Sequence, residues 1–303
     1  MKTARTVPLE ARRRPALAAW LLGGVLLTCT VHAEEEPVAT AVASKVSPDY
    51  VRARLADGTY RPESYAFGPG GLWAGMHDET IDRLKFIDVA RVIAGPLAEQ
   101  KYLPATIPAE TNILIMVYWG LTTVPPPIAD SPAFGNVQIA QTNLQMAITE
   151  GNPAVIAAAR AQLDFATGML GTEYQLRHRT DLQNGAMMGY DSVLRTANGL
   201  EHTALEMRRN DLFDELENNR YFVVLMAYDF QLLWKEKKHK LLWETRFSIA
   251  QRHNDFDRQL AAMAESASRY FGRDSHGLQR KPLPETSVNL GELKILGIEP
   301  EKK

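Results

Sequence analysis

Two stretches of the chain alternate between apolar and polar positions with a period of two, as half-buried β-strands do. In the stretch 221–234 the large apolar side chains fall on even positions, and in the stretch 241–249 on odd positions. The residues between them include no glycine or asparagine, which favours a four-residue loop, Glu236–His239, over a two-residue turn. We therefore expect a β-hairpin that places these two sets on one face, with Trp234 and Trp243 both buried.

Shorter elements precede this hairpin. Residues 112–119 form a continuous apolar run of strand length, which is typical of a strand covered on both faces. Residues 63–67 are a second strand candidate, and the glycine-rich segment 68–71 after them predicts a turn. Residues 78–94 have helical spacing, and Gly95-Pro96 should end or kink that helix.

A further helix is predicted after the hairpin. Asn254 suits its N-cap, and Asp255 and Asp257 lie in the first turn, where the helix dipole favours carboxylates. Apolar residues follow at helical spacing from Phe256, and Gly272 suits the C-terminal stop. We expect this helix to pack on the apolar face of the hairpin.

The long interval 125–220 is helical in pattern. Asn152-Pro153 combines an N-cap with a proline at the first helical position and opens a helix over 154–170. Further helical stretches are predicted over 192–209 and 211–218. The sequence thus predicts an α+β fold: a small helix-backed mixed sheet in the order strand, helix, strand, hairpin, helix, with a long all-helical insertion.

The first 33 residues have the pattern of a secretory signal. Arginines at 12–14 precede an apolar stretch from Ala16 to Cys29, and Val31-His32-Ala33 suits cleavage. We expect a mature chain that begins near Glu34 and is exported to the periplasm or cell envelope.

Three other readings of this leader stay open, and cleavage is favoured over each. A retained membrane anchor needs about 20 apolar residues, and this run is shorter and contains Gly23 and Gly24. The segment 26–29 resembles the end of a lipoprotein signal, which would anchor Cys29, but Thr28 stands where a smaller residue is expected. The triple arginine is a feature of twin-arginine export, but Pro15 follows it directly.

Removal of the leader changes the chemistry of the chain. It takes away the only cysteine, so neither a disulfide nor a thiolate remains. It also takes away five of the 34 basic residues and one of the 36 acidic ones, which leaves a net charge of −6. Nucleic-acid binding needs a basic surface, so we expect no nucleic-acid partner. The predicted organisation is a signal 1–33, a linker 34–60, a discontinuous α/β core 61–124 and 221–280, the helical insertion 125–220 and an extended tail 281–303.

Several short motifs, together with the order of the elements, resemble an uncharacterised bacterial envelope lipoprotein family (domain of unknown function 4136). The motifs are Ser64-Tyr65-Ala66-Phe67, residues 97–103 (LAEQKYL), Tyr228-Asp229 and Leu242-Trp243-Glu244. The resemblance covers about half the chain and leaves out the helical insertion. It implies an envelope-associated, non-catalytic α/β domain with a helix-backed sheet, and it carries over no catalytic residues.

Two motifs near the first predicted helix contain residue types of a cofactor or metal site. The segment 68–71 with Gly75 lies where a phosphate loop would lie, but Trp73 stands where a nucleotide fingerprint needs glycine, and Pro69 lacks a backbone donor. A plain turn explains it better. The segment 77–79 (His-Asp-Glu) begins the helix, where capping accounts for its acidic residues without a metal.

Two further motifs are also better explained by structural roles than by metal binding or catalysis. His202 and Glu206 lie four residues apart on a predicted helix and suit an exposed pair. Asp274-Ser275-His276 contains the residue types of a hydrolase triad, but adjacent residues cannot form its relay, so a polar loop is favoured. We predict no catalytic residue, no metal and no cofactor.

The most concentrated positive patch is the predicted hairpin tip, formed by Lys235, Lys237, Lys238, His239 and Lys240. It could contact anionic lipid headgroups or an acidic partner, at up to about 1 kcal/mol for each cation near a membrane. Solubility and protection of a strand edge account for lysines there equally well, and we favour that reading.

The leading functional hypothesis is a non-enzymatic envelope protein that binds another macromolecule through the helical insertion. We expect that partner to be another envelope protein. The alternative is a periplasmic small-ligand-binding protein or cryptic hydrolase with a pocket between insertion and sheet. Tyr118, Trp119 and Tyr190 are the candidate lining residues of such a pocket, although each is more often a core residue.

Overall fold

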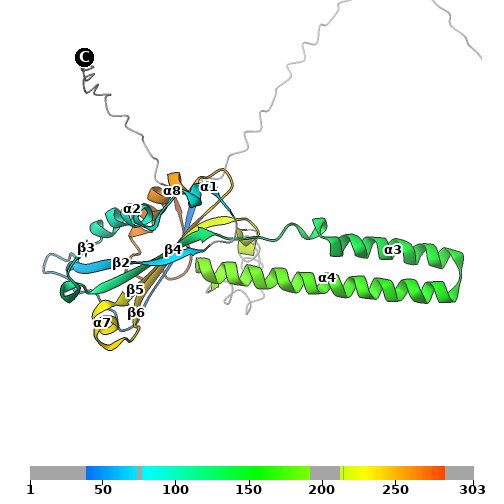
Figure 1. Cartoon of the computed structure of the whole chain (residues 1–303), viewed down its shortest axis with the longest axis horizontal. Coiled ribbons are helices and arrows are strands. Elements are labelled where there is room, and N and C mark those ends of the chain that lie inside the picture. Colours follow the sequence, from blue (N-terminus) through cyan, green and yellow to red (C-terminus); the bar gives the residue numbers. More distant parts are fainter. Residues whose placement is uncertain (1–38, 74–76, 192–211, 214, 284–303) are drawn as a thin grey trace, which may run out of the picture. The chain divides into compact units, whose positions relative to one another are not determined.

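The computed structural model describes residues 39–73, 77–191, 212–213 and 215–283. Their architecture is α+β, as predicted, with a seven-stranded mixed sheet in the order β3-β2-β4-β5-β6-β1-β7 (Figure 1). The strands are β1 (Ala39–Val46), β2 (Glu63–Trp73), β3 (Tyr102–Pro104), β4 (Ile113–Leu121), β5 (Arg220–Asp229), β6 (Leu241–Ala250) and β7 (Gln279–Pro282). The helices are α1 (Glu79–Asp82), α2 (Phe86–Glu99), α3 (Pro132–Glu150), α4 (Pro153–Met188), α7 (Phe230–Glu236) and α8 (Phe256–Ser268).

The sheet combines two kinds of pairing. β2 pairs in parallel with β3 and with β4, whereas β4, β5, β6, β1 and β7 are joined by antiparallel ladders. The strand predicted over 112–119 is confirmed as β4, which lies inside the sheet between β2 and β5. The predicted linker 34–60 is wrong in its middle part, because residues 39–46 form β1 between β6 and β7. The first two residues of the predicted tail 281–303 belong to β7, and the leader 1–33 lies outside the described residues.

α2 and α8 cover one face of the sheet and form the main core with it. Ile93 and Leu97 of α2 and Met263 of α8 are fully buried in this cluster. α8 begins one residue later than predicted, with Asp255 rather than Asn254 as its N-cap. Gly95-Pro96 was predicted to end or kink this helix, but α2 does not end there and continues to Glu99. The proline lies in the last turn, where it disturbs few hydrogen bonds.

The predicted helix-covered face is right for β6 but wrong for β5. The ladder pairs Val223 with Phe247 and Ala227 with Trp243, and these odd positions of both strands face α2 and α8. The larger even-position side chains of β5, such as Phe222, lie on the opposite face in a second cluster. Because β5 is buried on both faces, the alternation of large and small side chains does not reveal which face the helices cover.

The last residues of the strand predicted over 221–234 form a helix instead. Asp229 ends β5 and caps α7, its carboxylate accepting a hydrogen bond from the Leu232 N–H at 3.0 Å. The predicted strand therefore stops at Asp229. Trp243 is fully buried as predicted, but Trp234 lies on this short helix and is 45% exposed.

The insertion contains an antiparallel pair of long helices, α3 and α4, lying side by side (Figure 1). The Asn152 side chain caps α4 and Pro153 is its first residue, as predicted, but the helix runs past residue 170 to Met188. Buried alanines recur at intervals of seven on both helices: Ala140 and Ala147 on α3, Ala159 and Ala166 on α4. Small residues at this spacing let the two helices approach closely along one seam.

The C-terminal end of α4 covers the second face of the sheet. Met188 and Tyr190 are buried there against Phe222 and Val224 of β5. The predicted helix 192–209 lies outside the described residues. Among the described residues, no helix is both long enough and apolar enough to cross a membrane.

Candidate functional site

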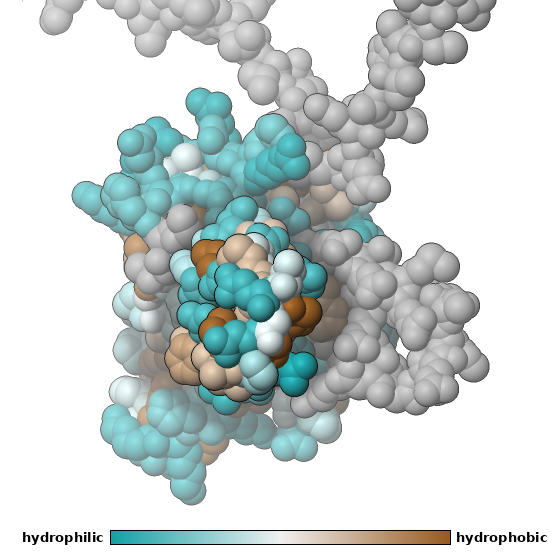
Figure 2. Space-filling view, turned by 90° about the vertical axis from the view of Figure 1, so that its right-hand side faces the viewer, coloured by the Kyte–Doolittle hydropathy of each residue, from teal (hydrophilic) through white to brown (hydrophobic). Residues whose placement is uncertain are grey.

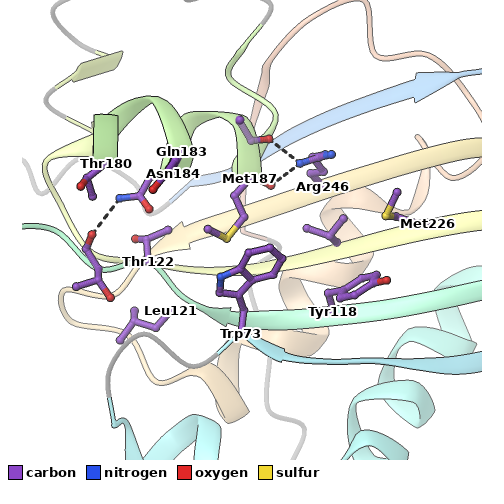
Figure 3. Close-up of a pocket in the computed structure, with 13 residues that line it drawn as sticks. Trp73, Tyr118, Leu121, Thr122, Thr180, Gln183, Asn184, Met187, Met226 and Arg246 are labelled. Carbon is purple, nitrogen blue, oxygen red and sulfur yellow. Dashed lines mark hydrogen bonds between the residues drawn. The ribbon is translucent and has the colours of Figure 1, made fainter. Parts of the chain in front are cut away.

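A cavity of about 780 Å³ lies between the end of α4 and the second face of the sheet (Figure 3). β4 and β5 form its floor, the last residue of β2 forms one wall, and the last three turns of α4 form its roof. It is lined by Trp73, Tyr118, Leu121, Thr122, Thr123, Thr180, Gln183, Asn184, Ala186, Met187, Val224, Met226 and Arg246. Figure 3 shows the side chains of Trp73 and Met187 directed into the space between helix and sheet, with Tyr118 lying along the sheet.

Glycines in β2 create the space above the floor. The segment Gly68-Pro69-Gly70-Gly71, predicted as a turn, is part of β2 and contains a β-bulge between Pro69 and Gly71. A β-carbon built on Gly70 would lie 2.7 Å from three atoms of the Tyr118 ring. The ring face therefore lies over the bare Gly70 backbone. Tyr118 is held flat against the sheet in this way, and the volume above it stays open.

Gly120, a glycine of β4, positions the tryptophan wall. A β-carbon on Gly120 would lie 2.4 Å from the Trp73 carbonyl oxygen and 3.1 Å from its β-carbon. Only glycine permits the end of β2 to approach β4 this closely. Trp73 is 55% exposed, so one side of its indole lines the cavity entrance while part of it contacts solvent.

The roof is fastened to the sheet by an arginine. The Arg246 guanidinium donates to the carbonyl oxygens of Ala186 at 2.6 Å and Met187 at 3.0 Å, and it pairs with Glu244 at 3.1 Å. Cations are favoured at helix C-termini, where the free carbonyls and the dipole are negative. Gly189 ends α4 in a left-handed conformation (φ 84°), and a β-carbon there would lie 2.5 Å from that of Ala43. The helix end is thus tightly fixed.

Several polar groups around the cavity already have partners within the protein. The Thr122 hydroxyl accepts from the Arg220 N–H at 2.8 Å, and the Asn184 amide donates to the Thr123 carbonyl at 3.1 Å. The Thr180 hydroxyl donates to the Leu176 carbonyl at 3.2 Å. Among the lining residues that the structure describes, the Gln183 side-chain amide makes no hydrogen bond and is exposed.

The three predicted lining residues fall in different places. Tyr118 lines the cavity, as predicted. Trp119, the next residue of β4, points to the opposite face and belongs to the α2–α8 core. Tyr190 lies in the second cluster outside the cavity lining, where its hydroxyl bonds to Glu215 at 2.9 Å and burial raises its pKa to about 12.

The basic patch at residues 235–240 spans the end of α7 and the following loop. Lys238 pairs with Glu236 at 3.0 Å and Lys240 pairs with Asp49 at 3.7 Å, while Lys237 is the left-handed C-cap of α7 (φ 57°). The His239 ring lies edge-on to Tyr228. Two of its cations are therefore neutralised locally, and Lys235 lies in the last turn of α7, which a cation stabilises.

The acidic motif 77–79 is a capping motif in the structure. The Asp78 carboxylate accepts from the backbone N–H groups of Thr80 and Ile81, and also from Tyr221 at 2.8 Å and Gln251 at 3.0 Å. Burial alone would raise the Asp78 pKa, but the hydrogen bonds from Thr80, Tyr221 and Gln251 outweigh it and lower the pKa below its ordinary value.

Among the described residues, the remaining motifs do not form a catalytic or metal site. In 274–276, the Ser275 hydroxyl donates to the Ser44 carbonyl at 3.1 Å, and His276 is exposed beside Asp274. His202 and Glu206 lie outside the described residues. No group of three or more metal-ligating side chains occurs in the described part of the chain.

Trp73, Met187, Met226 and Arg246 were not predicted as site residues. They come from β2, α4, β5 and β6, so no local sequence pattern joins them. One signal pointed to the region: three glycines within a strand-length segment, which indicates that another side chain approaches the backbone closely. No protein-family model matches this chain, and no curated protein matches it.

Proposed function

We propose that this chain is an exported, non-catalytic protein of the cell envelope that binds another envelope protein through the α3–α4 helical hairpin. One observation carries the proposal. Large apolar side chains are exposed along both helices, among them Ile139, Met146, Phe165, Met169 and Leu176. Phe165 alone is 73% exposed. Exposed apolar side chains that cluster on one surface mark interaction sites in soluble proteins.

Helical spacing gathers these side chains into one face. Ile139 and Met146 lie seven residues apart, so they share a stripe along α3. Phe165, Met169 and Leu176 share a stripe along α4 for the same reason. When the alanine seams of two antiparallel right-handed helices face each other, both stripes lie on the same side of the hairpin. Figure 2, which views the hairpin end-on, shows apolar patches on the sides of the helices among polar ones.

The charge of the hairpin supports a protein partner. Residues 132–172 contain three charged side chains, Glu150, Arg160 and Asp164. Anionic lipid and nucleic-acid surfaces are recognised through clusters of lysine and arginine, which this segment lacks. The centres of protein–protein interfaces, in contrast, are depleted in charge and enriched in aromatic residues and methionine. The hairpin shares the depletion in charge, and Met146, Phe165 and Met169 are among its exposed apolar side chains.

The export part of the proposal rests on the leader sequence. A signal removed near Ala33 would place the mature chain in the periplasm or envelope, in line with the resemblance to the envelope lipoprotein family. Peripheral contact with anionic lipid through residues 235–240 is a weaker possibility, since Glu236 and Asp49 already pair with two of those cations.

Photo-crosslinking tests the proposal in the cells that produce the protein. A photoreactive amino acid replaces Phe165 in one variant and the exposed Thr167, which lies on the opposite side of α4, in the control. We expect one discrete protein adduct from position 165 and none from 167, on a chain whose N-terminus is Glu34. A third variant, at Lys238, reports on lipid contact. Lipid adducts alone, or a diffuse smear from position 165, would overturn the proposal.

A shortened hairpin separates binding from folding. Residues 132–172 are replaced by a short Gly-Ser turn, which keeps the contacts of Arg177 with the Pro125 and Pro126 carbonyls at the base of the hairpin. We expect this variant to unfold at nearly the same temperature as the parent and to lose the partner in a pull-down. A variant that fails to fold would show that the hairpin belongs to the core, which contradicts the proposal.

A further inference from the structure

We propose that the cavity between α4 and the sheet is a binding site for an uncharged, mainly apolar small molecule. This inference concerns a different surface from the hairpin face and does not depend on the protein-binding role. The volume of the cavity, about 780 Å³, falls within the range of small-molecule sites, which is roughly 300–1,000 Å³.

The walls are those of an apolar ligand site. Trp73 and Tyr118 contribute two aromatic rings, and Met187 and Met226 contribute two flexible thioethers from opposite sides. Aromatic rings offer large apolar surfaces with few internal rotations to restrict, and methionine adapts its shape to the group it contacts. A ligand with a planar apolar part would fit between them.

The charge state of the ligand follows from Arg246, the one charged residue among the described residues that line the cavity. Its guanidinium is already occupied by Glu244 and by the two carbonyl oxygens at the end of α4. An anionic ligand would lie beside the Glu244 carboxylate and the negative C-terminal end of α4, and a cationic ligand would meet no carboxylate among the described lining residues. A charged group would therefore lose its hydration without gaining a partner, which is costly. The free Gln183 amide can supply one or two hydrogen bonds to a neutral polar group.

The cavity is also preformed. Arg246, the Asn184–Thr123 hydrogen bond and the close approach of Gly189 to Ala43 hold the roof, while Gly70 and Gly120 hold the two rings of the floor and wall. A site whose walls are fixed before binding spends less conformational entropy on the ligand.

The probe for the test is N-phenyl-1-naphthylamine, an uncharged aromatic fluorophore, titrated into the mature full chain. We expect saturable binding with energy transfer from tryptophan. Ala186→Trp, which places a bulky ring in the roof from an exposed helix position, should weaken binding by about tenfold or more because it fills the cavity. The matched control Ala161→Trp, on the same helix outside the cavity, should change the affinity by less than about twofold.

A second pair of measurements removes the dependence on one variant. Trp73→Ala should weaken binding and reduce the energy transfer. The sulfonated analogue 8-anilinonaphthalene-1-sulfonate should bind at least about fivefold more weakly than the neutral probe, because its charge finds no partner in the cavity. Equal affinity of the parent and Ala186→Trp for the neutral probe, or tighter binding of the sulfonated probe, would overturn the proposal. The proposal would also be overturned if only the variant with the shortened hairpin lost probe binding, since the probe would then bind to the hairpin face.

Discussion

The ring of Tyr118 lies directly over the backbone of Gly70, so close that a β-carbon on Gly70 would come within 2.7 Å of three ring atoms. This contact joins two parallel strands and determines the depth of the cavity. It explains why a glycine-rich segment continues as a strand rather than turning.

Gly70→Ala should therefore push the Tyr118 ring up into the cavity. We expect a loss of about 1–3 kcal/mol in the free energy of unfolding, since the substitution overpacks a close contact. The affinity for N-phenyl-1-naphthylamine should fall at the same time. Gly95→Ala is the control, because a β-carbon there meets nothing within 4 Å and α2 should gain up to about 1 kcal/mol. Denaturant titrations of both variants check this prediction, and equal effects would contradict it.

The two tryptophans of the 228–249 segment should respond very differently to truncation. Trp243→Ala should cost about 4 kcal/mol, because the indole is fully buried and packs against Phe271 and Tyr102. Trp234→Ala should cost less than about 1 kcal/mol, because that side chain is half-exposed and stacks only on Phe230 among the rings described. Urea unfolding followed by circular dichroism gives both values. A large cost at Trp234 would favour the two-strand reading of this segment.

Asp78 should make the stability of the protein dependent on pH at the acidic end. Its folded-state pKa lies below the ordinary value of 3.8, so its contribution is complete above that pH and is lost as the pH falls through the folded-state pKa. Asp78→Ala should cost about 2 kcal/mol at pH 7 because it removes the cap of α1 and the acceptor of Tyr221 and Gln251.

The difference between the parent and Asp78→Ala should shrink as the pH falls below about 3.8. Chemical denaturation across pH 2.5–7 checks this. Asp49→Ala, at an exposed position, is the control and should change stability by less than about 0.5 kcal/mol at any of these values. A constant difference between the parent and Asp78→Ala over the whole range would contradict the assignment.

Arg52 should not tolerate lysine. Its guanidinium lies between the rings of Tyr60 and Tyr102, at 4.3 and 4.1 Å from their centroids, and donates to the Gln100 carbonyl at 2.7 Å. Lysine keeps the charge but loses the planar stacking, so Arg52→Lys should cost about 2 kcal/mol. Arg54→Lys is the matched control on the exposed side of Tyr60 and should cost less than about 0.5 kcal/mol. Thermal unfolding separates the two, and equal shifts would contradict the prediction.

Local patterns in the sequence determined the elements whose signals are local. The apolar run 112–119 became β4, and Asn152-Pro153 opened α4, because burial on both faces and helix capping each depend on a few adjacent residues. The α+β class followed from the same signals. The exposed basic residues at 235–240 were also predicted, since charge alone keeps them in water.

Only the tertiary structure decided which face of β5 meets the helices, because both faces of that strand are buried and its alternation is then ambiguous. It also decided that residues 39–46 form a strand and that residues 68–71 continue one. The edge of β6 supplies partners for β1, and Tyr118 needs a surface without β-carbons beneath it. The cavity depends on residues from β2, β4, β5, β6 and α4. Contacts between residues this far apart in the sequence leave no periodic trace in it, so the site became visible only in the folded chain.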